Sequence, residues 1–195
     1  MARPFHPDDL KIPHVENGMS VGLFGGSFNP PHQGHVPVVE TAMKRLQLDR
    51  VWWMVSPGNP LKNNDDLPPL SGRIEVSRSL IDHPRVDVSG LEVSLSVHYS
   101  ADLVRELISR FPTVRFVWLM GADNLTNFHY WERWEDIVGN LPMAVIDRPG
   151  DTLASRASMV ARKFAEARLD ERDACLLYTS PSPRDQRGSR MPSSA

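Results

Sequence analysis

Short, continuous apolar runs alternate with amphipathic stretches along most of this chain. Runs without polar interruption are typical of strands buried on both faces of a sheet. Such runs make up the expected strands at residues 21–24, 51–55, 114–120 and 142–147, in which only Arg115 and the final Asp147 are charged. Between them, apolar residues recur at three- and four-residue steps, as in residues 38–46, which is the helical period. The alternation predicts an α/β fold with a doubly wound, mostly parallel sheet, whose ligands bind at the carboxyl ends of the strands.

The expected helices have recognisable starts and ends. One begins near Gly34, where Pro37 falls in a first turn that tolerates proline, and a second follows a candidate N-cap at Ser71. A third opens at Ser100 and ends before Pro112. The four expected helices cover about residues 34–46, 72–82, 100–111 and 153–164. Around residues 86–100 the pattern indicates a short β-like alternation instead.

Size and composition limit the class of protein. The 195 residues fit one domain with an ordinary core. The chain is 41% hydrophobic with a formal net charge of −2, and no stretch reaches the roughly 18 apolar residues of a membrane span. We therefore expect a cytoplasmic protein with no nucleic-acid or membrane partner, and its oligomeric state is left undetermined. The single cysteine, Cys175, predicts neither a disulfide nor a zinc site.

The segment GLFGGSFNPPHQGH, residues 22–35, joins a strand to a helix through a glycine turn. Gly25 and Gly26 let the backbone approach a phosphate closely, and Ser27 with the following amides can donate to it. The positive end of the helix that begins near Gly34 points to the same place. The segment therefore predicts an anion site, whereas the alternative is a purely structural turn.

Two histidines, His32 and His35, fall at the opening of this helix. Their imidazoles can neutralise negative charge that builds on a phosphorus centre and its leaving group. An isolated H-x-x-H pair would be better explained by a surface or metal-binding role, but the surrounding strand, turn and helix favour electrostatic catalysis. The sequence contains no Rossmann G-x-G-x-x-G and no P-loop pattern, which argues against dinucleotide oxidoreductases and kinases.

The same segment resembles the H-x-G-H signature of the nucleotidyltransferase superfamily. Within it, FVWLMGADNLTNFHYWERWEDI, residues 116–137, is similar to the segment that marks bacterial nicotinate-nucleotide adenylyltransferases. The resemblance runs from about Val21 to Pro149 and implies a Rossmann-like nucleotidyltransferase fold. It also implies transfer of AMP from ATP to nicotinate mononucleotide, giving deamido-NAD and pyrophosphate in NAD biosynthesis. Mg²⁺ would be held mainly by the ATP phosphates, without a metal site built from side chains.

The resemblance further implies roles for residues at matching positions. The expected catalytic residues are His32 and His35. The expected ATP-binding residues are Gly25, Gly26, Ser27, Phe28, Gly34, Lys62, Gly121 and Asp123. The expected residues for nicotinate mononucleotide are Ser100, which replaces the family's usual threonine, and Trp131, whose indole offers a flat π-face. Without the resemblance, Lys62 would be interpreted as a solvated loop side chain and Trp131 as a core or surface residue.

The chain is expected to have one domain between two unstructured ends. Residues 1–19, polar and interrupted by prolines, predict a flexible lead-in, and residues 20–174 would form the nucleotidyltransferase domain. Residues 175–195 predict a disordered tail that resembles translated adapter or vector sequence, so we interpret it as non-native. Family members carry a late Ser-[Ser/Thr]-x-x-Arg motif, of which Ser180 and Arg184 keep only the outer spacing. A donor arginine and a closing helix are therefore expected to be missing.

Several alternatives stay open at this point. The chain could act on nicotinamide mononucleotide, or it could be another H-x-G-H enzyme that uses phosphopantetheine or an alcohol phosphate. The sequence GADNLTNFHYW argues against the last two acceptors. It could also be an inactive, truncated copy that binds a nucleotide without chemistry.

Overall fold

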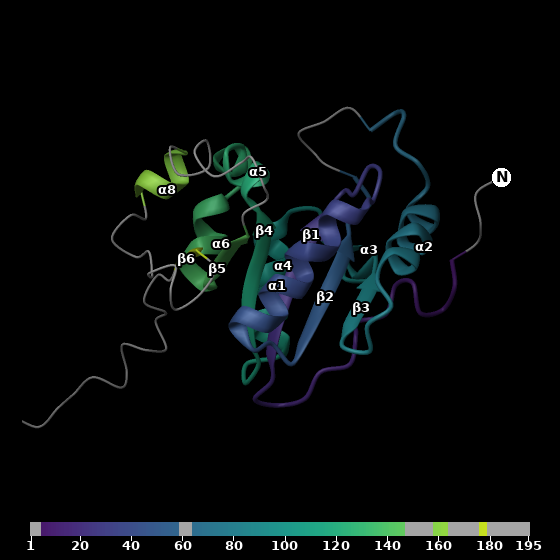
Figure 1. Ribbon diagram of the computed structural model, residues 1–195, viewed down its shortest axis with the longest axis horizontal. Helices are drawn as coiled ribbons and strands as arrows, with labels where there is room; N and C mark the ends of the chain where they lie inside the picture. The colour runs from purple at the N-terminus through teal and green to yellow at the C-terminus, as the bar shows by residue number, and fades with distance from the viewer. Residues whose placement is uncertain (1–4, 59–63, 147–157, 164–175, 179–195) are drawn as a thin grey trace, which may run out of the picture.

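The computed structural model describes residues 5–58, 64–146, 158–163 and 176–178, which form a sheet covered by helices on both faces (Figure 1). The strand order is β3-β2-β1-β4-β5-β6. The strands are β1 (Ser20–Gly26), β2 (Arg50–Val55), β3 (Val86–Ser89), β4 (Arg115–Gly121), β5 (Met143–Ile146) and β6 (Leu176–Tyr178). The first five pair in parallel and β6 is antiparallel to β5. The predicted doubly wound, mostly parallel sheet is confirmed.

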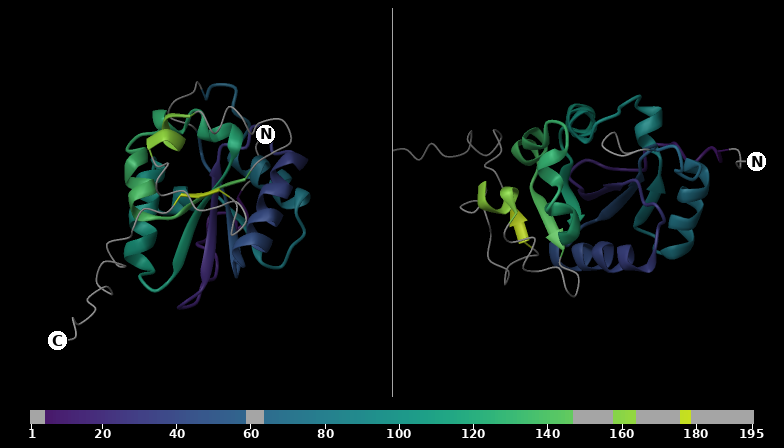
Figure 2. Two further views of the ribbon diagram at one scale, coloured as in Figure 1. Left: turned by 60° about the vertical axis from the view of Figure 1, so that its left-hand side comes forward. Right: turned by 90° about the horizontal axis from the view of Figure 1, so that it is seen from above.

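The helices divide between the two faces of the sheet (Figure 2). One face carries α1 (Val36–Leu46) and α2 (Leu70–Leu80), and the other carries α4 (Ser100–Arg110) and α6 (Trp134–Asn140). Shorter helical segments are η1 (Gln33–His35), α3 (Leu91–Ser94), α5 (Ala122–Leu125), η2 (Phe128–Tyr130) and α8 (Met159–Lys163). Trp52 packs toward α4, and its neighbour Trp53 packs toward α1, because successive strand residues point to opposite faces. Both are fully buried, and the strand is apolar and buried from Val51 to Val55.

The winding of the chain reverses beside β1. This strand pairs with β2 on one side and with β4 on the other, and the later strands add outward on each side. The loops that leave the carboxyl ends of β1 and β4 therefore run in opposite directions and leave a crevice between them. Doubly wound sheets bind their ligands at such a point.

The N-terminal segment is packed, which corrects the prediction of a flexible lead-in over residues 1–19. Within its described part, Asp9 is 2% exposed and accepts a hydrogen bond of 2.5 Å from Arg78 of α2. The backbone carbonyl of Asp9 also accepts from the Gly90 N–H at 2.6 Å. The apolar residues that pack against the core on the α4 face are Ile12, Val15 and Met19. These anchors follow neither the helical nor the strand period, so the sequence pattern did not reveal them.

Part of the predicted disordered tail is also paired. Residues 176–178 form β6 along the edge of β5, opposite residues 143–145. The prediction that residues 175–195 would not pack is wrong for these three, because β5 offers a row of backbone donors and acceptors at the sheet edge. The rest of that segment, including Ser180 and Arg184, lies outside the described residues. So do residues 153–157 and 164 of the last expected helix, of which α8 is described.

Two local expectations need smaller corrections. Helix α2 begins at Leu70 with Pro69 as its N-cap residue, so Ser71 lies inside the helix instead of capping it. After β3 the chain turns into the short helix α3, so the β-like alternation stops at Ser89. Across the described ranges, no helix is both long and apolar enough to cross a membrane.

Candidate active site

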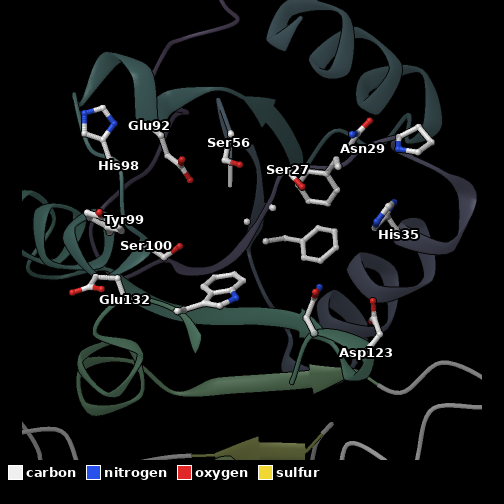
Figure 3. A pocket seen from close by; sticks show the side chains of 18 of the residues that line it. Ser27, Asn29, His35, Ser56, Glu92, His98, Tyr99, Ser100, Asp123 and Glu132 are labelled. Carbon is white, nitrogen blue, oxygen red and sulfur yellow. The ribbon is translucent and has the colours of Figure 1, made fainter. Parts of the chain in front are cut away.

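A pocket of about 530 Å³ opens above the carboxyl ends of β1 and β4 (Figure 3). The loop after β1 and η1 form one wall, the loops after β4 form another, and α3 with the start of α4 closes one end. The predicted site residues that line it are Gly25, Gly26, Ser27, Phe28, His32, His35, Ser100, Asp123 and Trp131. Residues from distant parts of the chain thus meet in one cavity.

Three predicted site residues are not among the lining residues. Gly34 lies behind His32, and its N–H donates to Nδ1 of that ring at 3.1 Å. A Cβ at Gly34 would come within 2.9 Å of the same ring, so a larger residue there would displace the His32 side chain. Gly121 is the buried last residue of β4. Lys62 lies outside the described residues.

Phe28 stabilises the conformation of the turn after β1. This residue has φ of 45°, a left-handed conformation that costs a non-glycine residue about 1 kcal/mol or more. Its ring is 6% exposed and lies 5.2 Å, centroid to centroid, from each of Phe24 and Trp53. A Cβ at Gly26 would lie 3.3 Å from the Phe28 ring. Because the Phe28 ring is packed against the core, the conformation of this turn is fixed and residues 25–28 line the pocket.

The two histidines stack at the start of α1, with ring centroids 3.8 Å apart. Nδ1 of His32 accepts the Gly34 N–H, so a neutral His32 carries its proton on Nε2. Nδ1 of His35 lies 3.1 Å from both the backbone nitrogen and the carbonyl oxygen of His32. Phe28 packs edge-on to His35 at 5.0 Å. Backbone contacts and aromatic packing therefore fix both rings at the pocket wall.

Arg73 of α2 holds the loop backbone from behind the pocket. The residue is 2% exposed. Its Nη1 donates to the carbonyl oxygens of Ser27 at 2.5 Å and Ser56 at 2.8 Å, while Nη2 donates to Pro57 at 3.1 Å and Nε to Pro68 at 2.9 Å. Burial lowers the pKa of this guanidinium. Within the described part of the chain no carboxylate pairs with it, so its positive charge lies beneath the glycine turn.

At the other end of the pocket, Arg133 ties the loop carrying Trp131 to the first turn of α4. It donates to Asp102 at 2.5 Å, and its guanidinium carbon lies 5.9 Å from the centre of the Tyr99 ring. The hydrogen bond from Arg133 is the main reason that the pKa of Asp102 lies below its usual value. Trp131 packs edge-on to Phe128 at 5.2 Å. This end of the pocket is thus held together by side chains from two separate elements.

Comparisons with known proteins assign the family. The family model described as cytidylyltransferase-like matches residues 23–185. A protein of Mesorhizobium japonicum named "Probable nicotinate-nucleotide adenylyltransferase" is 51% identical over 172 residues, covering 88% of each chain. A protein of Brucella abortus with the same name is 53% identical over 165 residues, covering 85% of each. The chain belongs to the nicotinate-nucleotide adenylyltransferase family.

Solved structures agree with the adenylyltransferase fold. Two structures of nicotinic acid mononucleotide adenylyltransferase from Plasmodium falciparum, one complexed with APC and one with NaAD, align with TM-scores of 0.58 and 0.55. Their sequence identities to this chain are 17% and 15%, and each alignment covers 69% of this chain and 67% of that chain. At these identities the likeness supports the fold alone.

The sequence analysis missed several residues at this adenylyltransferase pocket. Among the lining residues these include Ser56, Glu92, His98, Tyr99 and Glu132. Arg73 was also missed, because no local period distinguishes it from an exposed arginine on an amphipathic helix. For Glu92 a usable signal was its position between two apolar residues, Leu91 and Val93.

Proposed function

We propose that this chain transfers AMP from ATP to nicotinate mononucleotide, giving deamido-NAD and pyrophosphate. The observation that carries the proposal is that the glycine turn and both histidines share one cavity with Ser100 and Trp131. Relatives at 51% and 53% identity bear the name of this activity. A cavity of about 530 Å³ also falls in the usual size range of small-ligand sites, roughly 300–1,000 Å³.

The two substrates would occupy opposite ends of the pocket. The triphosphate of ATP would lie against the turn of Gly25, Gly26 and Ser27, where backbone amides and the positive charge of Arg73 favour an anion. Asp123 would face the adenosine. The pyridine ring of the mononucleotide would lie at the end formed by Ser100 and Trp131. Each of these assignments follows from matching positions in the family and from the placement of the residues around the cavity.

The reaction requires positioning and charge neutralisation. An oxygen of the 5′-phosphate of nicotinate mononucleotide would attack the α-phosphorus of ATP, forming a P–O bond as the bond to the bridging oxygen breaks. The electron pair of that bond leaves with pyrophosphate. The Nε2–H of His32 and the imidazole of His35 would stabilise the charge on the transferring phosphoryl group and on the leaving group. No covalent intermediate with the chain is needed.

A metal ion would enter with ATP. The described residues contain no group of three or more His, Cys, Asp or Glu side chains that could hold one. We propose Mg²⁺, held mainly by the phosphate oxygens of ATP, which are ligands that this ion favours. When bound, it would neutralise part of the triphosphate charge.

The test is pyrophosphate release from ATP and Mg²⁺ with nicotinate mononucleotide, nicotinamide mononucleotide or no acceptor. Release that requires an acceptor and is faster with the nicotinate form supports the proposal. Faster release with the nicotinamide form would reassign the acceptor, and release without any acceptor would indicate a hydrolase. ATP binding without release would identify an inactive nucleotide-binding chain. A cytoplasmic location stays a prediction.

A further inference from the structure

Glu92 is a buried carboxylic acid in the pocket for which the proposed mechanism has no use. It belongs to α3, is 7% exposed, and lines the cavity together with Tyr99 and Ser100. Figure 3 shows its carboxyl group pointing into the pocket. Within the described residues, no hydrogen bond or ion pair involves this group. Because a buried polar group without a partner costs free energy, its position indicates a contact made by a ligand.

The surroundings of Glu92 do not favour its charged form. The described lining contains no lysine or arginine. On the neighbouring elements, Arg78 is bound to Asp9, and Arg73 donates to backbone carbonyls. The other titratable side chains of the lining are His32, His35, His98, Tyr99, Asp123 and Glu132. Burial raises the pKa of Glu92 to about 8, so at pH 7 its carboxyl group is mostly neutral and has an O–H to donate.

The place of Glu92 in the pocket points to the acceptor rather than to ATP. In Figure 3, Ser27 and His35 lie toward one end, and Glu92 lies with Ser100 toward the other. The first end would receive the triphosphate. Glu92 would therefore face the pyridine ring, whose substituent is a carboxylate in nicotinate mononucleotide and an amide in nicotinamide mononucleotide.

Building on the proposed function, we propose that Glu92 donates a hydrogen bond to the pyridine carboxylate and thereby sets the preference between nicotinate and nicotinamide acceptors. A neutral carboxyl group gives a short, charge-assisted hydrogen bond to a carboxylate. After losing its proton, Glu92 repels the carboxylate but can accept from the amide N–H of the nicotinamide form. The acceptor preference therefore changes with pH.

The test measures pyrophosphate release with each mononucleotide at saturating ATP, from about pH 6.5 to about pH 9.5. Above pH 8, kcat/KM for the nicotinate form falls about tenfold per pH unit, mainly through KM, because one proton is needed for binding. For the nicotinamide form, kcat/KM does not show this fall of about tenfold per pH unit. ATP and the 5′-phosphate are common to both reactions, so their own titrations cancel in the ratio of the two kcat/KM values. Glu92→Gln keeps an N–H donor but cannot ionise, and its ratio stays constant over this range.

Glu132→Gln is the matched control, because Glu132 is an exposed carboxyl group that also lines the pocket. This variant keeps the pH dependence of the wild-type ratio. A constant ratio in the wild-type chain, which needs no variant to fold, overturns the proposal. The proposal is also overturned if the ratio of the two kcat/KM values still changes with pH in Glu92→Gln, or if it no longer changes with pH in Glu132→Gln. No release from the wild-type chain with either acceptor would instead overturn the proposed function, and the role of Glu92 with it.

Discussion

Replacing Arg73 with methionine should loosen the glycine turn and weaken ATP binding. The guanidinium makes four hydrogen bonds to backbone carbonyls at 2.5–3.1 Å. Hydrogen bonds from a charged donor contribute roughly 1.5–3 kcal/mol each, about 6–12 kcal/mol as an upper bound. Two effects offset part of this loss, because water can hydrate the freed carbonyls and methionine does not carry the desolvation cost of a buried charge. The net loss of unfolding free energy should therefore be about 3–5 kcal/mol. For a chain of this size that corresponds to a fall in Tm of roughly 6–20 °C.

The kinetic effect should be concentrated on ATP. The carbonyl oxygen of Ser27 belongs to the turn that would meet the triphosphate, and a shift of about 1 Å at such a site can lower the rate about 100-fold. We expect kcat/KM for ATP to fall about 100-fold in Arg73→Met, with a much smaller change in KM for the mononucleotide. Arg73→Lys keeps the charge but loses the planar guanidinium, so its kcat/KM for ATP should lie between those of the wild type and Arg73→Met. Steady-state kinetics at temperatures well below each Tm measure this, with Tm followed by calorimetry.

Arg50→Met provides the matched control. Arg50 is a partly buried arginine that is bound to Asp87 through two hydrogen bonds of 2.8 and 3.0 Å. It lies at the amino end of β2, away from the pocket. It should lower Tm while leaving KM for ATP unchanged. If Arg73→Met kept kcat/KM for ATP within about twofold of wild type, or if Arg50→Met lost as much, the role of Arg73 in holding the turn would be refuted.

Three further predictions concern single residues in the pocket. His35→Ala should lower kcat at least about 100-fold with a small change in KM for ATP, and near-normal turnover in steady-state assays would contradict its assignment. Trp131→Ala should raise KM for the mononucleotide about tenfold, whereas equal rises for ATP and the mononucleotide would indicate a purely structural role. Because the folded-state pKa of Glu92 is raised from 4.5 to about 8, the contribution of this residue to folding stability should be greatest below about pH 4.5 and should fall as pH rises toward 8. Glu92→Gln should therefore gain about 3 kcal/mol of unfolding free energy at pH 7 and less than about 1 kcal/mol at pH 5, and an equal gain at both pH values in chemical denaturation would refute this sign.

Most of the fold and much of the pocket could be predicted because they depend on local patterns. The apolar run of β2 is buried on both faces, and the periodic residues of α1 face the sheet. The glycine turn after β1 and the two histidines lie at the carboxyl end of a strand, as their order in the sequence indicated. A strand that ends in glycines and is followed by a helix places the connecting loop at the carboxyl end of the sheet, where such folds bind their ligands.

What the sequence did not predict depends on contacts between distant residues. Asp9 looked like part of a polar lead-in, and only its pairing with Arg78, 69 positions along the chain, shows that it is buried. Arg73 looked like a surface residue until the loops after β1 and β2 came together around its guanidinium. In both cases no local period marks the residue, because its partners come from elsewhere in the fold.

The sequence by itself determined the α/β class and the family and predicted a candidate site at the end of β1, since short apolar runs and a contiguous motif are local properties of the chain. Only the tertiary structure decided which side chains close the pocket. Sheet order brings α3, α4 and the loops after β4 to the glycine turn. That assembly buries the carboxyl group of Glu92 and raises its pKa, because the free energy of a charge depends on its surroundings in space and not on its neighbours in sequence.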